Sequence, residues 1–210
     1  MTLRQKETAD ETRERIALVA EEMFRRMGFA KTAVADIAAA LDMSPANVYR
    51  FFPSKNAIVE TICNRCLGEV ETQIADIARG AGTPSERIAA VFLAILAYHR
   101  DNFLIERRVH DMVLVAIDHN WAAIEAHKLR VRSVLESLLL DGIATGDYVP
   151  HDARQAGEIL LGAMVRFCHP VLIAHMIDHD LEQELRVSLR FVLRSVEAAR
   201  TPLGGAIQSE

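Results

Sequence analysis

Cysteines and long apolar runs are scarce in this chain of 210 residues, and their scarcity excludes several classes of protein. Three cysteines, an odd number, do not make the disulfide framework of a small secreted domain. No apolar run reaches the roughly 18 residues that cross a bilayer. The N-terminal stretch MTLRQKETADETRER is charged and lacks the apolar core of a signal peptide. We therefore expect a cytoplasmic protein without a membrane partner.

The short motifs that mark common enzyme classes are also missing. GxSxG, the P-loop, GxGxxG after a strand, and HExxH are all absent from the sequence. Pairs of Asp and Glu are frequent, but they fall at expected helix starts and on polar helix faces. We therefore predict that the chain is not an enzyme and uses no cofactor.

Charge is distributed unevenly along the chain. The net charge is -5, whereas residues 1–60 contain nine Lys or Arg and nine Asp or Glu, so the excess acidity lies after residue 60. A neutral segment can still bind DNA if its cations cluster on one face. The charge therefore permits a nucleic-acid partner without requiring one.

Helical periodicity extends along the whole sequence, and no stretch keeps the alternation of a β-strand. Prolines and glycines fall at the apparent helix ends. The pattern predicts an all-α fold, with a bend at Pro170 in the penultimate helix. The expected helices span residues 10–27, 34–41, 45–51, 55–79, 84–99, 102–117, 121–144, 153–177 and 181–199.

The stretch SPANVYRFFPSK, residues 44–55, carries the strongest functional signal. Ser44 is a good N-cap and Pro45 suits the first helical position, while Pro53 stops the helix after about two turns. With the short helix expected at 34–41, this stretch predicts a helix-turn-helix, whose second helix lies in the major groove of DNA.

Side chains of this second helix and of the next helix start are suited to DNA. Ser44 and the free N–H groups beside it suit phosphate oxygens, and Asn47 can pair bidentately with adenine. Tyr49 and Arg50 lie on the following turn, within reach of a phosphate or a base edge. Lys55 begins the next helix, where its positive charge disfavours the helix dipole unless a phosphate lies nearby.

The segment TAVADIAAALDMSPANVYRFFPSKNAIVE resembles the DNA-binding segment of TetR-family transcriptional regulators, over roughly residues 10–60. The resemblance implies a homodimer that binds a palindromic operator in double-stranded DNA. Together with the residues above, it leads us to predict a ligand-responsive regulator, in the form of a repressor that a small-molecule effector releases.

The resemblance also implies roles for single residues. It implies phosphate contacts for Tyr49 and Lys55 and a helix-start contact for Thr32, which we also expect to cap the short helix after it. Base contacts fall on Pro45, Ala46 and Asn47. One position departs from the family pattern. Ala35 stands where the family often has Arg or another polar residue that contacts bases, so we expect fewer base contacts from the helix at 34–41.

We predict three parts for the chain. Residues 1–54 form a helix-turn-helix DNA-binding domain, residues 55–200 a larger helical domain for effector binding and dimerisation, and residues 201–210 a flexible tail. The alternative is a helical protein-interaction adaptor without DNA binding, which would not need Tyr49 or Lys55.

In the resembled family the larger domain encloses a ligand pocket, and its last two helices pair with a second subunit. Small residues among larger apolar ones would let two such helices approach closely in a four-helix interface. His169, just before the bend at Pro170, could line a cavity. The other candidates for the effector pocket are Phe92, His99, Phe103, His110, Met112, Trp121 and Phe167. The candidates for the dimer interface are Ile159, Leu160, Ala163, Phe167, Leu185, Leu189, Val192 and Val196.

Two spacings suggest a metal site only weakly. His175 and His179 are four residues apart, which would place both rings on one helix face, but His179 is expected to lie past the helix end. Cys63 and Cys66 form a single C-x-x-C pair in the middle of a helix, without a second pair nearby. We predict no metal ligand among them.

Overall fold

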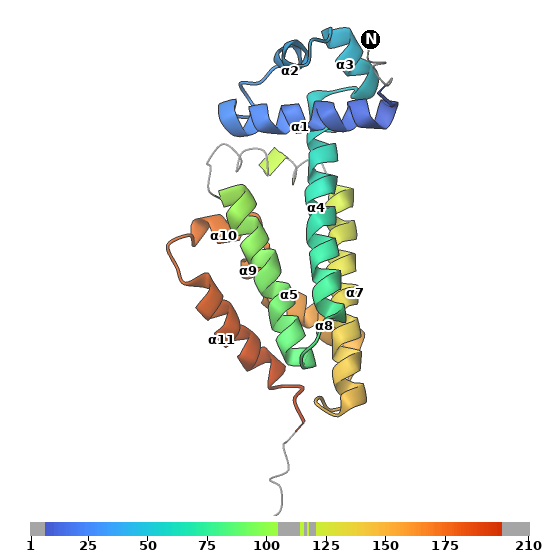
Figure 1. Cartoon of the computed structure of the whole chain (residues 1–210). Helices are drawn as coiled ribbons and strands as arrows, with labels where there is room; N and C mark the ends of the chain where they lie inside the picture. The colour runs from blue at the N-terminus through green and yellow to red at the C-terminus, as the bar shows by residue number, and fades with distance from the viewer. Residues whose placement is uncertain (1–6, 105–113, 116, 118–120, 199–210) are drawn as a thin grey trace, which may run out of the picture.

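The computed structural model describes residues 7–104, 114–115, 117 and 121–198. Within these ranges the chain is all-α, as predicted, and the only β-type pairing is an isolated bridge between Tyr148 and Glu197. A small unit of three helices lies at one end of an elongated molecule (Figure 1). The elements are α1 Ala9–Met27, α2 Val34–Ala40, α3 Pro45–Phe51, α4 Lys55–Arg79, α5 Pro84–His99, η1 Arg100–Leu104, α7 Trp121–Thr145, α8 Ala153–Ala163, α9 Val165–Cys168, α10 Pro170–His175 and α11 Leu181–Leu193.

Capping side chains set most of these helix ends. Thr8 and Glu11 form a reciprocal capping box at the start of α1, and Gly28 ends that helix with a φ of 91°, which favours glycine. Ser54 caps α4 and Thr83 caps α5 by accepting a backbone N–H three residues later. These ends agree with the sequence-based expectations to within one residue.

The start of α2 differs from expectation. Ala33, and not Thr32, is its N-cap residue, and Asp36 accepts the Ala33 backbone N–H at 2.8 Å. Thr32 instead donates its hydroxyl to the Gly28 carbonyl at 2.9 Å, which closes the turn after α1. The expected cap was therefore wrong, because Thr32 stabilises the preceding turn.

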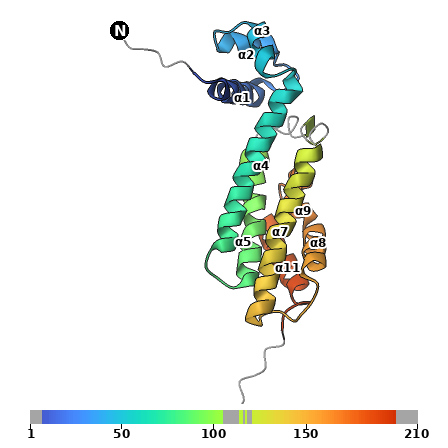
Figure 2. The same ribbon diagram turned by 90° about the vertical axis from the view of Figure 1, so that its right-hand side faces the viewer.

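Helix α4 belongs to two hydrophobic cores. Its first turns, with Ile58 and Ile62, are buried with residues of α1, α2 and α3. Its later turns, with Val70 and Ile74, are buried with residues of α5, α7, α8 and α11. The helix descends from the three-helix unit along α7 (Figures 1 and 2). The division predicted at residue 54 thus precedes a helix that both units share.

The segment between residues 153 and 177 is not one bent helix but three short ones. The chain leaves helical geometry at Met164 and again at His169, whose ψ is 117°. Pro170 accounts for the second break, because its ring forces the preceding residue towards extended geometry. The single-helix prediction was therefore wrong for this segment.

The last helix is shorter than expected. It ends at Leu193, where Ser195 donates its hydroxyl to the Val192 carbonyl at 2.7 Å. The chain then runs along the loop after α7, where the Val149 N–H donates to the Val196 carbonyl at 2.8 Å. Most of the helix expected at 102–117 lies outside the described residues. Residues 102–104 belong to the π-helix η1, and residues 114, 115 and 117 are α-helical. No helix among the described residues has both the length and the apolar character needed to cross a membrane.

Gly142 allows the closest side-chain approach in the larger unit. A Cβ at this position would lie 2.1 Å from the Tyr148 ring, which is almost fully buried and whose hydroxyl is 2.7 Å from Ser85 Oγ. Gly142→Ala should therefore lower the free energy of unfolding by about 1–3 kcal/mol, measured by urea denaturation. Gly68→Ala is the matched control, because nothing lies within 4 Å of its Cβ, and it should stabilise α4 by up to about 1 kcal/mol. Equal effects of the two changes would contradict this packing.

Candidate nucleic-acid interface and internal pocket

The N-terminal end of α3 is built as an exposed helix start. Ser44 Oγ accepts the Asn47 backbone N–H at 3.2 Å, and Pro45 occupies the first turn. Pro45 and Ala46 are exposed and Asn47 is half-buried, while Val48 anchors the opposite face in the core. The helix therefore presents the predicted base-contacting residues at the end of the molecule remote from α11 (Figure 1).

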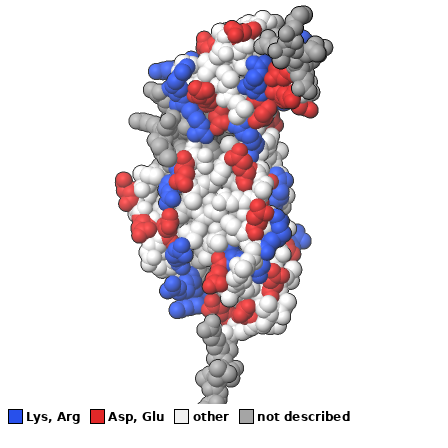
Figure 3. Space-filling model, in the orientation of Figure 1, with Lys and Arg blue, Asp and Glu red and all other residues white. Residues whose placement is uncertain are grey.

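Tyr49 and Arg50 are exposed on the same helix. The Tyr49 side chain is 51% exposed although it is large and partly apolar. Arg50 makes no ion pair with any other described residue. Acidic and basic side chains are interspersed over this end of the molecule, on the face shown in Figure 3. On this face, therefore, no large positive patch is available to a nucleic acid, which would be recognised there through a few well-placed groups.

Lys55 has a structural role that the sequence did not indicate. Its Nζ donates to the carbonyls of Phe29 and Thr32 at 2.8 and 3.1 Å and lies 4.0 Å from the centre of the Phe29 ring. Partial burial lowers its pKa. An ammonium group has three N–H donors, so Lys55 can hold the α1–α2 loop and still offer one donor outward.

Among the residues predicted to contact DNA, Thr32 is the one that is buried. Its side chain is only 1% exposed, and its hydroxyl is used by the Gly28 carbonyl. The Thr32 hydroxyl is therefore engaged within the protein, and the helix-start contact to DNA at this position stays a prediction.

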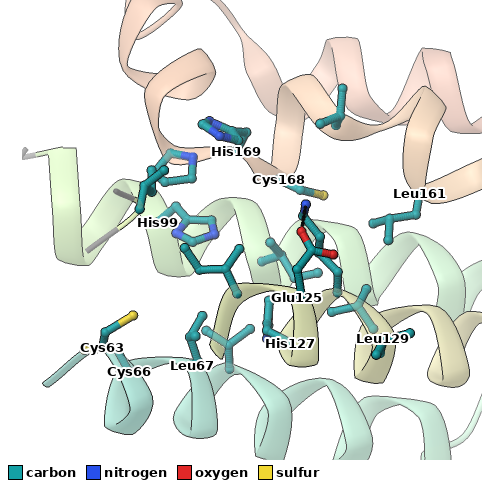
Figure 4. A pocket seen from close by; sticks show the side chains of 18 of the residues that line it. Cys63, Cys66, Leu67, His99, Glu125, His127, Leu129, Leu161, Cys168 and His169 are labelled. Atoms are coloured by element: carbon teal, nitrogen blue, oxygen red, sulfur yellow. Dashed lines mark hydrogen bonds and ion pairs between the residues drawn. The ribbon is translucent and has the colours of Figure 1, made fainter. Parts of the chain in front are cut away.

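A pocket of about 600 Å³ lies inside the larger unit. Residues of α4, α5, α7, α8, α9 and the start of α10 line it, so it is assembled from segments that are far apart in the sequence (Figure 4). The volume falls in the range of roughly 300–1,000 Å³ typical of small-molecule sites.

Of Phe92, His99 and Phe167, three predicted effector candidates whose side chains are described, one lines this pocket. That residue is His99, at the end of α5. Phe92 and Phe167 are fully buried in the core and do not reach the pocket, because their sides of the helices face other helices. His110 and Met112 lie outside the described residues, as do the side chains of Phe103 and Trp121. His169, expected to line a cavity beside the bend at Pro170, does line the pocket.

The sequence reasoning missed most of the lining. All three cysteines of the chain, Cys63, Cys66 and Cys168, contribute to this one pocket, and so do Tyr98 and His127. Cys63 and Cys66 are three residues apart, which places them on one face of α4. The C-x-x-C spacing thus indicates a shared helix face in the sequence, although it resembles a metal motif.

Burial favours the uncharged forms of the histidines and cysteines of the lining. It lowers the pKa of His99 to about 3, with smaller contributions from the nearby His127 and His169. It also raises the pKa of Cys63 to about 11 and that of Cys168 to about 12. The pocket interior therefore presents neutral imidazoles and neutral thiols at physiological pH.

A ring of polar contacts joins the pocket wall to α1. The Tyr98 hydroxyl donates to Glu69 at 2.6 Å, and Arg65, 3.9 Å from Glu69, also pairs with Glu21 of α1. Arg25 donates to the same Glu21 at 2.8 Å and to the Asn102 carbonyl in η1 at 3.0 Å. The amide of Asn102 then donates back to the Tyr98 carbonyl at 3.0 Å.

Half of the predicted dimer residues lie in the subunit's own core. Those that are fully buried are Leu160, Phe167, Leu185 and Leu189, so their assignment to an interface was wrong. Val192 and Val196 are half-buried against the same core. Ile159 and Ala163 are exposed on α8, and α11 exposes Val187 and Phe191, which were not predicted.

No three His, Cys, Asp or Glu side chains among the described residues converge in a way that could hold a metal ion. His175 ends α10 and is exposed. His179 lies past that helix end, as expected, and its Nδ1 is 3.0 Å from Glu184.

Comparison with known proteins places both units in one family. A sequence model described as "Bacterial regulatory proteins, tetR family" matches residues 16–62, and one described as "Tetracyclin repressor-like, C-terminal domain" matches residues 84–187. The probable HTH-type transcriptional regulator YttP of Bacillus subtilis is 19% identical over 202 residues, covering 90% of this chain and 98% of YttP.

Solved structures show the same fold. A TetR/AcrR-family regulator from Thermobifida fusca has a TM-score of 0.66 and 24% identity, covering 87% of this chain and 97% of that one. Thermus thermophilus FadR, a TetR-family repressor solved in complex with lauroyl-CoA, has a TM-score of 0.62 and 19% identity, covering 92% and 100%.

The shared use of Glu21 by two arginines gives a prediction about stability. Arg25→Met or Arg65→Met alone should be mild, because the remaining arginine still pairs with the largely buried Glu21 carboxylate. In the double variant, the free energy of unfolding should fall by about 1 kcal/mol or more beyond the sum of the two single decreases. Urea denaturation of all four proteins measures this coupling.

Arg79→Met is the control for that cycle. Arg79 and its partner Asp76 are both mostly exposed, so its loss should be nearly neutral and additive with either change. Additive effects of Arg25→Met and Arg65→Met would contradict the shared role of Glu21.

Proposed function

Because the chain belongs to the TetR family of bacterial regulatory proteins, we propose that it is a homodimeric, effector-responsive repressor that binds a palindromic operator in the cytoplasm. The family assignment itself makes it a DNA-binding transcription regulator and not an enzyme. The main structural support for DNA binding is the N-terminal end of α3, which is capped by Ser44 and exposed at one end of the molecule. A helical adaptor without DNA binding is set aside, because the DNA-binding family model covers this helix.

In the proposed complex, α3 enters the major groove with its N-terminal end first. Pro45, Ala46 and Asn47 face the bases, and Ser44 with the neighbouring backbone N–H groups faces a phosphate. Tyr49 and Arg50 reach the sugar-phosphate backbone or a base edge from the next turn. Lys55 uses its remaining donor for a phosphate while it holds the α1–α2 loop in place.

The proposed dimer forms through the outer faces of α8 and α11. Ile159 is 60% exposed on α8, and Phe191 is 78% exposed on α11, with Val187 one turn before it. Gly162 and Ala163 are exposed beside Ile159 and would allow close helix approach. Two such helices from each subunit make a four-helix interface, and a two-fold axis through it matches a palindromic operator.

The proposed effector response runs through α4. Val59, Ile62 and Cys66 line the pocket, and the same residues pack in the core beneath α1, α2 and α3. An effector that fits only one position of α4 would therefore bias the position of the DNA-binding unit. Half-sites lie about 34–36 Å apart, so a displacement of the two α3 helices weakens operator binding. The relative that was solved with lauroyl-CoA supports an effector with a long apolar part.

Selection of DNA from a random duplex pool by the purified protein tests this function. We expect a two-fold symmetric motif, since each subunit presents one α3. Recovery of no motif at low salt would overturn the proposal.

Two variants then separate the roles of α3 and Lys55 on the selected operator. Asn47→Ala should relax the preference at one base pair per half-site by about 1–3 kcal/mol. Lys55→Met keeps an apolar stem over Phe29 but removes the charge, so it should weaken binding to all sequences alike and lower the salt slope by about one phosphate contact per subunit. Competition binding with single-base operator variants measures both. Wild-type behaviour of both variants would mean that α3 does not dock in this way.

The proposed interface predicts a monomer when Phe191 is replaced by a charged residue. Phe191→Arg would bury an unpaired charge between subunits, so we expect a shift from dimer to monomer in analytical ultracentrifugation, with a loss of affinity for the two-site operator. Leu140→Arg on α7 is the matched control, because Leu140 is 52% exposed outside the proposed interface, and it should leave the dimer intact. A dimer that survives Phe191→Arg would exclude this surface.

A further inference from the structure

Charged side chains occur only in pairs at the edge of the pocket. Among the lining residues, Lys128 Nζ lies 2.7 Å from Glu125, and Arg132 pairs with Glu158 at 2.9 Å. Lys128, Glu125 and Glu158 are all more than two-fifths exposed, which places these pairs at the rim. Each pair cancels its own charge, so the rim offers no free counter-ion to a ligand.

The remaining polar side chains of the wall are neutral or already paired. Burial lowers the pKa of His127, whose Nδ1 is 2.9 Å from Glu71. Glu71 also pairs with Arg130 at 2.5 Å, so its charge is balanced outside the pocket. The Tyr98 hydroxyl donates to Glu69, as part of the ring described above. None of these groups is available to neutralise an ionised ligand.

Two histidines that could form hydrogen bonds with a ligand lie at one end of the pocket. Figure 4 shows His99 and His169 at one end, with Leu129 and Leu161 towards the other. His169 lies in the break before Pro170, and its half-buried ring lines the pocket. A neutral imidazole can donate one hydrogen bond and accept another. Burial lowers the pKa of His169 as well, with a smaller contribution from the nearby Lys128, so its ring is neutral.

We propose that the pocket binds an uncharged amphiphile, with its apolar part against Leu129 and Leu161 and a hydroxyl or similar neutral group at His169. This inference rests on the proposed function in one respect: a bound amphiphile is an effector only if the protein is an effector-responsive repressor. A hydroxyl both donates and accepts, so it can pair with the His169 ring in either tautomer. A carboxylate or an ammonium group would lose its hydration without gaining an opposite charge that is not already paired, because the cation near His169, Lys128, lies 2.7 Å from Glu125. The volume of about 600 Å³ readily holds a ten-carbon chain.

Three probes with the same chain and different charge test this proposal. They are 1-decanol, decanoate and decylammonium, added to the full-length protein without DNA at neutral pH. Binding is measured by displacement of N-phenyl-1-naphthylamine fluorescence and by calorimetry. We expect 1-decanol to bind about tenfold or more tightly than either ion, because only the ions bring an uncompensated charge. Tighter binding of either ion, or no binding of 1-decanol, would overturn the proposal.

Variants locate the binding within the pocket. His169→Phe should weaken 1-decanol binding severalfold and leave decylammonium unchanged, whereas His175→Phe, at an exposed histidine outside the pocket, should change neither. Leu161→Trp should abolish binding of all three probes by filling the apolar end. Leu129→Trp, at a 54% exposed position, serves the same purpose if Leu161→Trp does not fold. Undiminished 1-decanol binding by the tryptophan and His169→Phe variants would overturn the assignment.

Operator binding is measured on the same preparations. A protein that binds its operator and prefers decanoate refutes only the ligand class. A protein that prefers 1-decanol but selects no DNA motif refutes the repressor and keeps the ligand class.

Discussion

Helix α4 packs into both hydrophobic cores, and the other functional features of the molecule depend on that continuity. Its first turns hold α1, α2 and α3 together, and its later turns pack against α5 and α7. The pocket opens beside the point where α4 passes from one core to the other, between Cys66 and Val70. This continuity is the reason we propose that a change of packing in the pocket alters the position of the DNA-binding unit.

Electrostatics divide the molecule into a charged exterior and a neutral interior. Around α1 and α4 the ion pairs share partners, as Arg25 and Arg65 share Glu21. Inside the pocket, burial suppresses ionisation of His99 and Cys168. The same low polarity that makes the pocket selective against ions makes it unsuited to redox chemistry at the cysteines, since the reactive form of a thiol is the thiolate.

The helix bounds of the DNA-binding unit could be predicted from the sequence, because capping residues act on their immediate neighbours. The packing partners of the helices in the larger unit could not be predicted in this way. Ser44, Pro45 and Gly28 act on their immediate neighbours, so the bounds of α1 and α3 follow from residue types. An apolar stripe such as that of Leu185 and Leu189 shows only that one helix face is buried. It does not say whether the partner is the same chain or a second one, and here that face packs in the subunit's own core. The pocket was hard to predict for the same reason, because its wall combines residues from six helices that are far apart in the sequence.

The polar end of the pocket and the contact to α1 lie within four residues of each other along the chain. His99 ends α5, and the carbonyl of Asn102, in the π-helix that follows, accepts from Arg25 of α1. A π-helical turn is often found at a functional site. A ligand group held at His169 would press on the His99 ring beside it and so act on the turn that carries Asn102. We therefore expect the neutral group of the ligand, more than its chain, to decide whether the DNA-binding unit is released.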